Sequence, residues 1–187
     1  RIPSSNNGAT EKEHKYDEGY GYLFGLASDL ALPEASYMTG DVLLAKYTNK
    51  VNNGQEVGIF NTIFDAFKLG RAAVTQDVQS VADEQIDIVR KAISRVIAFK
   101  AIDYLESAAA SGGNASADMA DYFHDLSEGY GFIMSLQFTF DDGGTPYFTN
   151  VEVNNMLASL EAGNGFWDRT AQELTTMAND IKSRTGL

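Results

Sequence analysis

The stretch from His14 to Leu26, HKYDEGYGYLFGL, returns in a second form from His124 to Leu136, HDLSEGYGFIMSL. Six of the thirteen aligned positions are identical. The copies start 110 residues apart, which is too far for a short-period solenoid, so we interpret them as equivalent helices of a duplicated helical bundle. His14 and His124 are the only histidines in the chain, so the repeat is the first place to look for chemistry.

Composition narrows the class of protein. Hydrophobic residues make up 44% of the 187 residues, enough for a packed core. The net charge is −12 and the basic residues are scattered, which argues against nucleic-acid binding. The chain has no cysteine, which excludes disulfides and thiolate metal sites. No apolar run is long enough to span a membrane. The chain opens with Arg1 and shows no signal peptide, so we expect a processed product or a fragment.

Hydrophobic periodicity predicts an all-α fold, because apolar residues recur at helical spacing and no alternating strand pattern stands out. We expect a flexible entry at 1–9, loops at 49–54, 111–114 and 141–146, and a break at 163–165. The predicted helices span residues 10–29, 41–47, 57–74, 77–110, 116–140, 149–160 and 166–183. We expect residues 10–187 to form one helical domain, the C-terminal part of a longer precursor.

Each copy of the repeat places a histidine and a glutamate on one helical face. His14 and Glu18 are four residues apart, as are His124 and Glu128. If the copies pack on each other, the two pairs would face a shared interior and offer two imidazoles and two carboxylates. This donor set suits iron, zinc or manganese. Glycines within both predicted helices support close packing, because each costs about 1 kcal/mol relative to alanine unless something offsets it.

A structural interpretation needs no metal. Each histidine would then hydrogen-bond a glutamate across the pseudo-twofold that relates the copies, within a buried polar network. Arg71 is the cation that we expect to pair with Glu18 or Glu128 in that case. Asp17 and Asp125 face elsewhere on their helices, and we expect them to be solvated.

Several motifs together resemble a bacterial family, the domain of unknown function catalogued as four-eight-five-six. The resemblance starts near Glu13 and covers most of the chain. It rests on the repeat and on the segments FKLGRAAV and AIDYL between its copies. The matching residues are His14, Asp17, Glu18, Tyr20, Gly21, Tyr22, Gly25, Gly70, Arg71, His124, Ser127 and Glu128. The family usually has tryptophan at the place of Tyr16.

The resemblance implies an exported helical bundle, periplasmic or at the cell surface, often a lipoprotein and often found beside imelysin-like proteins linked to iron uptake. It also implies a further helical segment before the first histidine motif. Without it an apolar face would be exposed, so we expect that segment or a homo-oligomer as partner. The favoured function is an exported binding protein, with a metal ion held by His14, Glu18, His124 and Glu128. A structural or assembly role is the alternative, and a metal-dependent hydrolase ranks last because no general base is evident.

Overall fold

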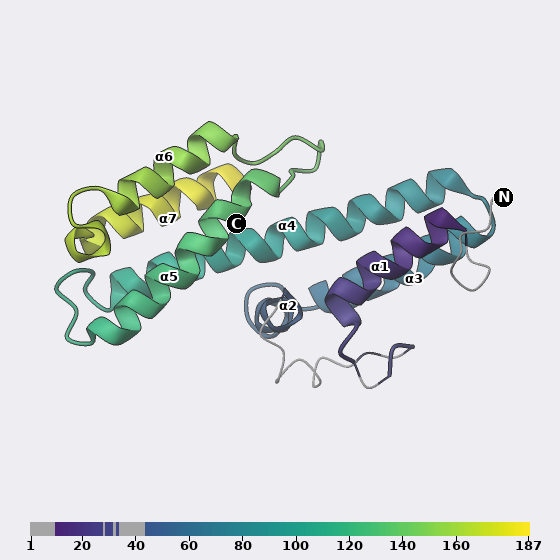
Figure 1. Cartoon of the computed structure of the whole chain (residues 1–187), viewed down its shortest axis with the longest axis horizontal. Coiled ribbons are helices and arrows are strands. Elements are labelled where there is room, and N and C mark those ends of the chain that lie inside the picture. The colour runs from purple at the N-terminus through teal and green to yellow at the C-terminus, as the bar shows by residue number, and fades with distance from the viewer. Residues whose placement is uncertain (1–9, 28, 32, 34–43) are drawn as a thin grey trace. The chain divides into compact units, whose positions relative to one another are not determined.

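The computed structural model describes residues 10–27, 29–31, 33 and 44–187, so the predicted entry at 1–9 lies outside the described residues. The described part contains seven α-helices and no strand, which confirms the predicted all-α class (Figure 1). None of its helices is long and apolar enough to cross a membrane. The helices are α1 (Glu11–Phe24), α2 (Leu44–Asn53), α3 (Ile59–Thr75), α4 (Gln79–Ala110), α5 (Met119–Ser135), α6 (Asn150–Glu161) and α7 (Ala171–Thr185), with short 3-10 helices η2 (Leu136–Phe138) and η3 (Gly165–Asp168).

The chain packs as two compact units, Arg1–Ala92 and Ile93–Leu187, and the boundary between them falls within α4. The first unit contains the first copy of the repeat, in α1. The second contains the other copy, in α5 and η2. The predicted single domain over residues 10–187 stays a prediction.

In the first unit, α1 packs on α3 (Figure 1). Aromatic side chains form much of this contact. Phe24 near the end of α1 is fully buried. Its ring meets those of Phe60, Phe64 and Phe67 edge-on, with centroids 5.4, 6.0 and 6.2 Å away. Edge-to-face contacts of this kind add to the hydrophobic gain from burial. The apolar residues whose spacing predicted a helix over residues 57–74 therefore form the face of α3 that packs against α1.

The predicted loop at residues 49–54 is wrong, because α2 continues through Asn53. Thr48 and Val51 are buried on its inner face, and Asn53 donates a side-chain hydrogen bond to Asn49 one turn earlier (3.0 Å). Asn52 accepts from the backbone N–H groups of Gly58 and Phe60, which fixes the turn into α3. Asparagine-rich sequence favours loops, but these side chains stabilise the helix end instead. The predicted helix at 41–47 lies partly outside the described residues.

The second unit buries a larger core around α5. Leu126, Ile133 and Leu136 are fully buried there against side chains of α4, α6 and α7. The helix predicted at 166–183 is interrupted, because Arg169 and Thr170 are extended and α7 begins only at Ala171. Thr170 caps α7 in a reciprocal pair with Glu173. The interruption lets the carbonyl of Arg169 accept from Asn114 N–H (2.8 Å), which ties this turn to the loop after α4.

Candidate functional site

The first copy of the repeat exposes its His/Glu pair. His14 Nε2 lies 3.1 Å from Glu18 Oε1, and both side chains are more than a third exposed. Lys15 also donates to Glu18 at 2.9 Å and lowers the pKa of this carboxyl below its usual range. This contact lies within one copy, whereas the structural interpretation predicted hydrogen bonds between the two copies. It lies at the surface of its unit, where solvent screens it.

A partly buried polar network lies on the neighbouring face of α1, where Glu13 and Asp17 each precede by one position the residues of the His14/Glu18 pair. Arg71 on α3 pairs with Glu13 (3.2 Å) and Asp17 (2.7 Å), not with Glu18. Only 7% of the Glu13 side chain is exposed, and Thr75 also donates to it at 2.9 Å. The carboxylates raise the pKa of Arg71, and Asp17 contributes most. The network fastens α1 to α3.

Helix geometry explains why Arg71 contacts Glu13 and Asp17 and not Glu18. Successive residues on a helix are rotated by about 100°, so the face of Glu13 and Asp17 differs from that of His14 and Glu18. Asp17 does face elsewhere, as predicted, but it is ion-paired across the helix interface and not merely solvated. Glu13 was missed by the sequence reasoning. Its signal was the Thr-x-x-Glu pattern of a capping box, in which Glu13 accepts from the N–H of Thr10 (2.7 Å).

The first glycine of each Gly-Tyr-Gly segment allows close packing, as predicted. A Cβ on Gly129 would lie 3.2 Å from the Cβ of Tyr104, and a Cβ on Gly19 would lie 3.4 Å from the Phe67 ring. The second glycine of each segment, at 21 and 131, would meet nothing within 4 Å. Close packing therefore accounts for only one glycine in each copy.

Gly70 allows a close approach between α1 and α3 in the first unit. An added Cβ there would lie 2.6 Å from the ring of Tyr16, a distance that real Cβ atoms do not tolerate. The absent side chain lets Tyr16 pass over α3, and its hydroxyl donates to the carbonyl of Ala82 on α4. Gly70 and Tyr16 together join α1, α3 and α4.

The second copy has a different environment. His124 is exposed, and its ring meets the edge of Tyr104 at a centroid distance of 6.5 Å. Glu128 is partly buried one turn further along α5. Asp125 accepts from the hydroxyl of Ser107 on α4, so it too contacts a neighbouring helix, against the expectation that it is solvated. Within the residues that the structure describes, no three histidine, aspartate or glutamate side chains gather as a metal site would require. Contact between the two copies stays a prediction.

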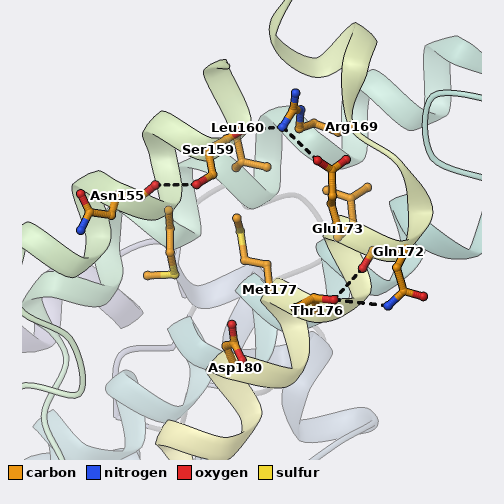
Figure 2. A pocket seen from close by; sticks show the side chains of 11 residues that line it. Asn155, Ser159, Leu160, Arg169, Gln172, Glu173, Thr176, Met177 and Asp180 are labelled. Carbon is orange, nitrogen blue, oxygen red and sulfur yellow. Dashed lines mark hydrogen bonds and ion pairs between the residues drawn. The ribbon is translucent and has the colours of Figure 1, made fainter. Parts of the chain in front are cut away.

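A concavity lies between α6 and α7 of the second unit (Figure 2). One pocket has a volume of about 450 Å³, and an adjoining one about 460 Å³. Met156 and Asp180 line both pockets, and we refer to the two adjoining pockets together as the α6–α7 groove. Its lining side chains are Phe148, Glu152, Asn155, Met156, Ser159, Leu160, Arg169, Gln172, Glu173, Leu174, Thr176, Met177, Asp180, Ser183 and Arg184.

Arg169 fixes one end of the groove. Its guanidinium donates to the carbonyls of Ser159 (2.7 Å) and Ala162 (3.0 Å), which end α6, and contacts Glu173 on α7 at 3.4 Å. Carbonyls at a helix C-terminus lack partners within the helix, so a cation there is favourable. The hydroxyl of Tyr122 on α5 donates to the carbonyl of Arg169 as well (3.0 Å). The turn between α6 and α7 is thus held from both sides.

The other end of the groove is fixed by Arg184. It pairs with Glu152 of α6 at 2.9 Å and donates to the carbonyl of Tyr147 at 3.1 Å. Glu152 also accepts from the backbone and hydroxyl of Thr149, and together these bonds and Arg184 lower its pKa to about 2. Sequence reasoning missed the groove. The available signal was the pair of methionines, Met156 and Met177, on two consecutive predicted helices.

A smaller pocket of about 300 Å³ lies on the first unit between α1 and α3. Aromatic side chains of both helices line it, together with Lys68 and Arg71. The hydroxyl of Tyr20 donates to the carbonyl of Leu30 at 2.6 Å and closes one side. Arg71 is already paired with its carboxylates, and Lys68 Nζ lies over the Phe64 ring, 5.8 Å from the ring centroid.

Comparison with known families finds a match. The family described as "Domain of unknown function (DUF4856)" matches residues 4–187, which is nearly the whole chain. No curated protein and no solved structure matches the chain.

Proposed function

The chain belongs to the DUF4856 family, and we propose that it is a helical binding protein whose ligand occupies the α6–α7 groove. The observation that carries this proposal is the pattern of partners along the groove. Arg169 pairs with Glu173 at one end and Arg184 with Glu152 at the other. The space between them has the apolar side chains of Met156, Leu160 and Met177, and it has the size of ordinary ligand sites.

Two methionines make the groove adaptable. Met156 and Met177 are only partly buried, one on each helix. Figure 2 shows Met177 extending into the space between the helices. Methionine is flexible and polarisable, so it adjusts to apolar partners of different shape. The ion pairs fix both ends of the groove and the methionines between them can adjust, so the groove is suited to bind an apolar surface.

Fluorescence titration with Nile red, a neutral apolar probe, tests the proposal. We expect Met156→Gln and Met177→Gln each to weaken probe binding by about tenfold, since burial of apolar surface drives it. Met134→Gln is the matched control, because Met134 is exposed on α5 and does not line the groove. Equal affinity in all three variants would overturn the proposal.

A second candidate function is metal binding by the repeat, with iron, zinc or manganese as the ion. The contact of 3.1 Å between His14 and Glu18 on one face of α1 supports it, because two such donors can chelate one ion. His124 and Glu128 would be the equivalent pair on α5. Elemental analysis of the purified protein tests this candidate. Near-stoichiometric metal that is lost in the His14→Ala/His124→Ala double variant, but kept in Lys15→Ala, would support it. No metal after supplementation with each ion would contradict it.

The network of Glu13, Asp17, Arg71 and Thr75 supports a structural role for the polar residues of the first copy. These contacts join helices and leave His14 and Glu18 at the surface. We therefore assign the binding function to the groove and regard the repeat as the part that assembles the helices.

We include export in the proposal, with the protein periplasmic or at the cell surface, on the strength of the motif resemblance alone. Cell fractionation with an antibody against this domain tests it. Recovery in the cytoplasmic fraction would contradict export.

A further inference from the structure

We propose that the occupant of the α6–α7 groove is a basic amphipathic helix from a partner protein. This inference rests on the proposed function, and it adds the chemical class of the ligand. The groove is flanked by two helices along its length (Figures 1 and 2). Such a groove is the usual receptor of an amphipathic helix, which lays its apolar face between the flanking helices.

The length of the groove fits a helix. Its lining residues on α7 recur every three or four positions from Gln172 to Arg184. At 1.5 Å per residue this stretch is about 18 Å long, or more than three helical turns. On α6 the lining residues run from Glu152 to Leu160 with the same spacing. A ligand helix of about twelve residues would contact both walls along the full groove.

The charge of the groove selects a cationic partner. Both arginines at its ends are paired with glutamates. Asp180 lies between these pairs and lines both pockets, and within the described residues no hydrogen bond or ion pair engages its carboxylate. Figure 2 shows this side chain at the edge of the pocket on the α7 side. The groove therefore has one carboxylate in excess, in a chain of net charge −12.

A partner lysine or arginine that docks beside Asp180 would complete this set of charges. Complementary charge of this kind speeds association and fixes the register of the bound helix. A helix from a second copy of this acidic chain fits less well on charge, and we make it an outcome of the test. The occupant that the observations favour is thus a helix with leucine-like residues on one face and a basic residue at the position opposite Asp180.

Calorimetric titration of the whole chain with two designed helical peptides tests the inference. The peptides share one leucine pattern, and their polar face is lysine in one and glutamate in the other. We expect the lysine peptide to bind and the glutamate peptide to bind at least tenfold more weakly. We also expect Asp180→Asn to weaken the lysine peptide by about fivefold at low salt, the effect of one partly exposed ion pair. Asp65→Asn is the matched control, because it removes the same charge from an exposed position of α3.

The outcomes separate this inference from the function on which it rests. Equal binding of both peptides, or no effect of Asp180→Asn, would overturn the basic helix, while Nile red binding that depends on Met177 would leave the binding function in place. Lysine-peptide binding that survives Met177→Gln would be non-specific attraction and would overturn the inference. Self-association of the chain that is abolished by Met177→Gln would overturn it too, because a second copy would then be the occupant.

Discussion

The two copies of the repeat fold as the same kind of helix but are held by different forces. In the first, polar side chains of α1 bind Arg71 of α3. In the second, apolar side chains of α5 enter the core of their unit. The clearest case is an identical residue: Leu26 is 70% exposed, whereas its equivalent Leu136 is fully buried. The sequence shared by the copies specifies a helix with one closely packed glycine, and the residues that differ specify what the helix packs against.

The largest expected effect on stability comes from the second copy of the repeat, in α5. Leu126 is fully buried, and its equivalent in the first copy is Tyr16, which is partly exposed. We expect Leu126→Ala to lower the free energy of unfolding of the second unit by about 2–5 kcal/mol, from lost burial plus a cavity. Urea unfolding followed by circular dichroism measures it. As comparison, Tyr16→Phe removes one hydrogen bond and should cost about 1 kcal/mol. A loss below 1 kcal/mol for Leu126→Ala would contradict the apolar account of this copy.

A smaller effect on stability is expected in the first unit, where polar side chains of α1 pair with Arg71. Arg71→Gln removes the cation that faces Glu13, a nearly buried carboxylate. We expect the first unit to lose about 2 kcal/mol, less than for a fully buried pair because Arg71 is itself about one-third exposed. Arg90→Gln is the control, since its pair with Asp87 is exposed on both sides. Chemical denaturation of both variants checks this. Equal stability would mean that the network does not hold α1 on α3.

The two glycines of one segment are expected to respond differently to substitution by alanine. Gly21→Ala and Gly131→Ala place a methyl group where nothing lies within 4 Å. Each should raise stability by up to about 1 kcal/mol, because alanine favours the helix. Gly129→Ala should lack this gain, since the new Cβ would press on that of Tyr104. Melting temperatures of the three variants decide the point, and a rise for Gly129→Ala equal to the others would contradict the close packing.

The smallest effect is a dependence on pH. Thr149 and Arg184 lower the pKa of Glu152 from 4.5 to about 2. A lowered carboxyl pKa stabilises the fold above the unfolded value, near pH 4.5, and that stabilisation is lost as pH falls toward 2. Glu152→Gln should therefore reduce the loss of stability over this range. Denaturation midpoints between pH 5 and 2 measure the change, and curves that stay parallel would contradict the lowered pKa of Glu152.

Local sequence predicted most of the helices. Thr149 was expected to begin a helix and does, in a reciprocal pair with Glu152. The Ser111–Asn114 segment ends α4 as expected. Such features depend on neighbours within four residues, so one sequence suffices. The break at Arg169 and Thr170 was missed, because it is stabilised by Asn114 more than fifty residues earlier.

The candidate functional site was harder to predict, because it too depends on contacts between residues that are distant in the sequence. The repeat drew attention to His14 and Glu18, although the contacts between helices belong to Glu13 and Asp17. Periodicity gives the faces of a helix but does not say which face meets a partner. The α6–α7 groove depends on the separation of two helices, which Arg169 sets through the carbonyls of Ser159 and Ala162. Nothing in the local pattern around Arg169 reveals this role.

Methyl NMR of the methionines tests the central claim, that the groove is the binding site, most directly. The chain has five methionines, so each gives one signal that point substitution assigns. On titration with the lysine-faced peptide, the account predicts that the methyl signals of Met156 and Met177 shift together and saturate, while those of Met119 and Met134 stay in place. Shifts confined to Met119 or Met134, or no shift at Met156 and Met177 at saturating peptide, would contradict it.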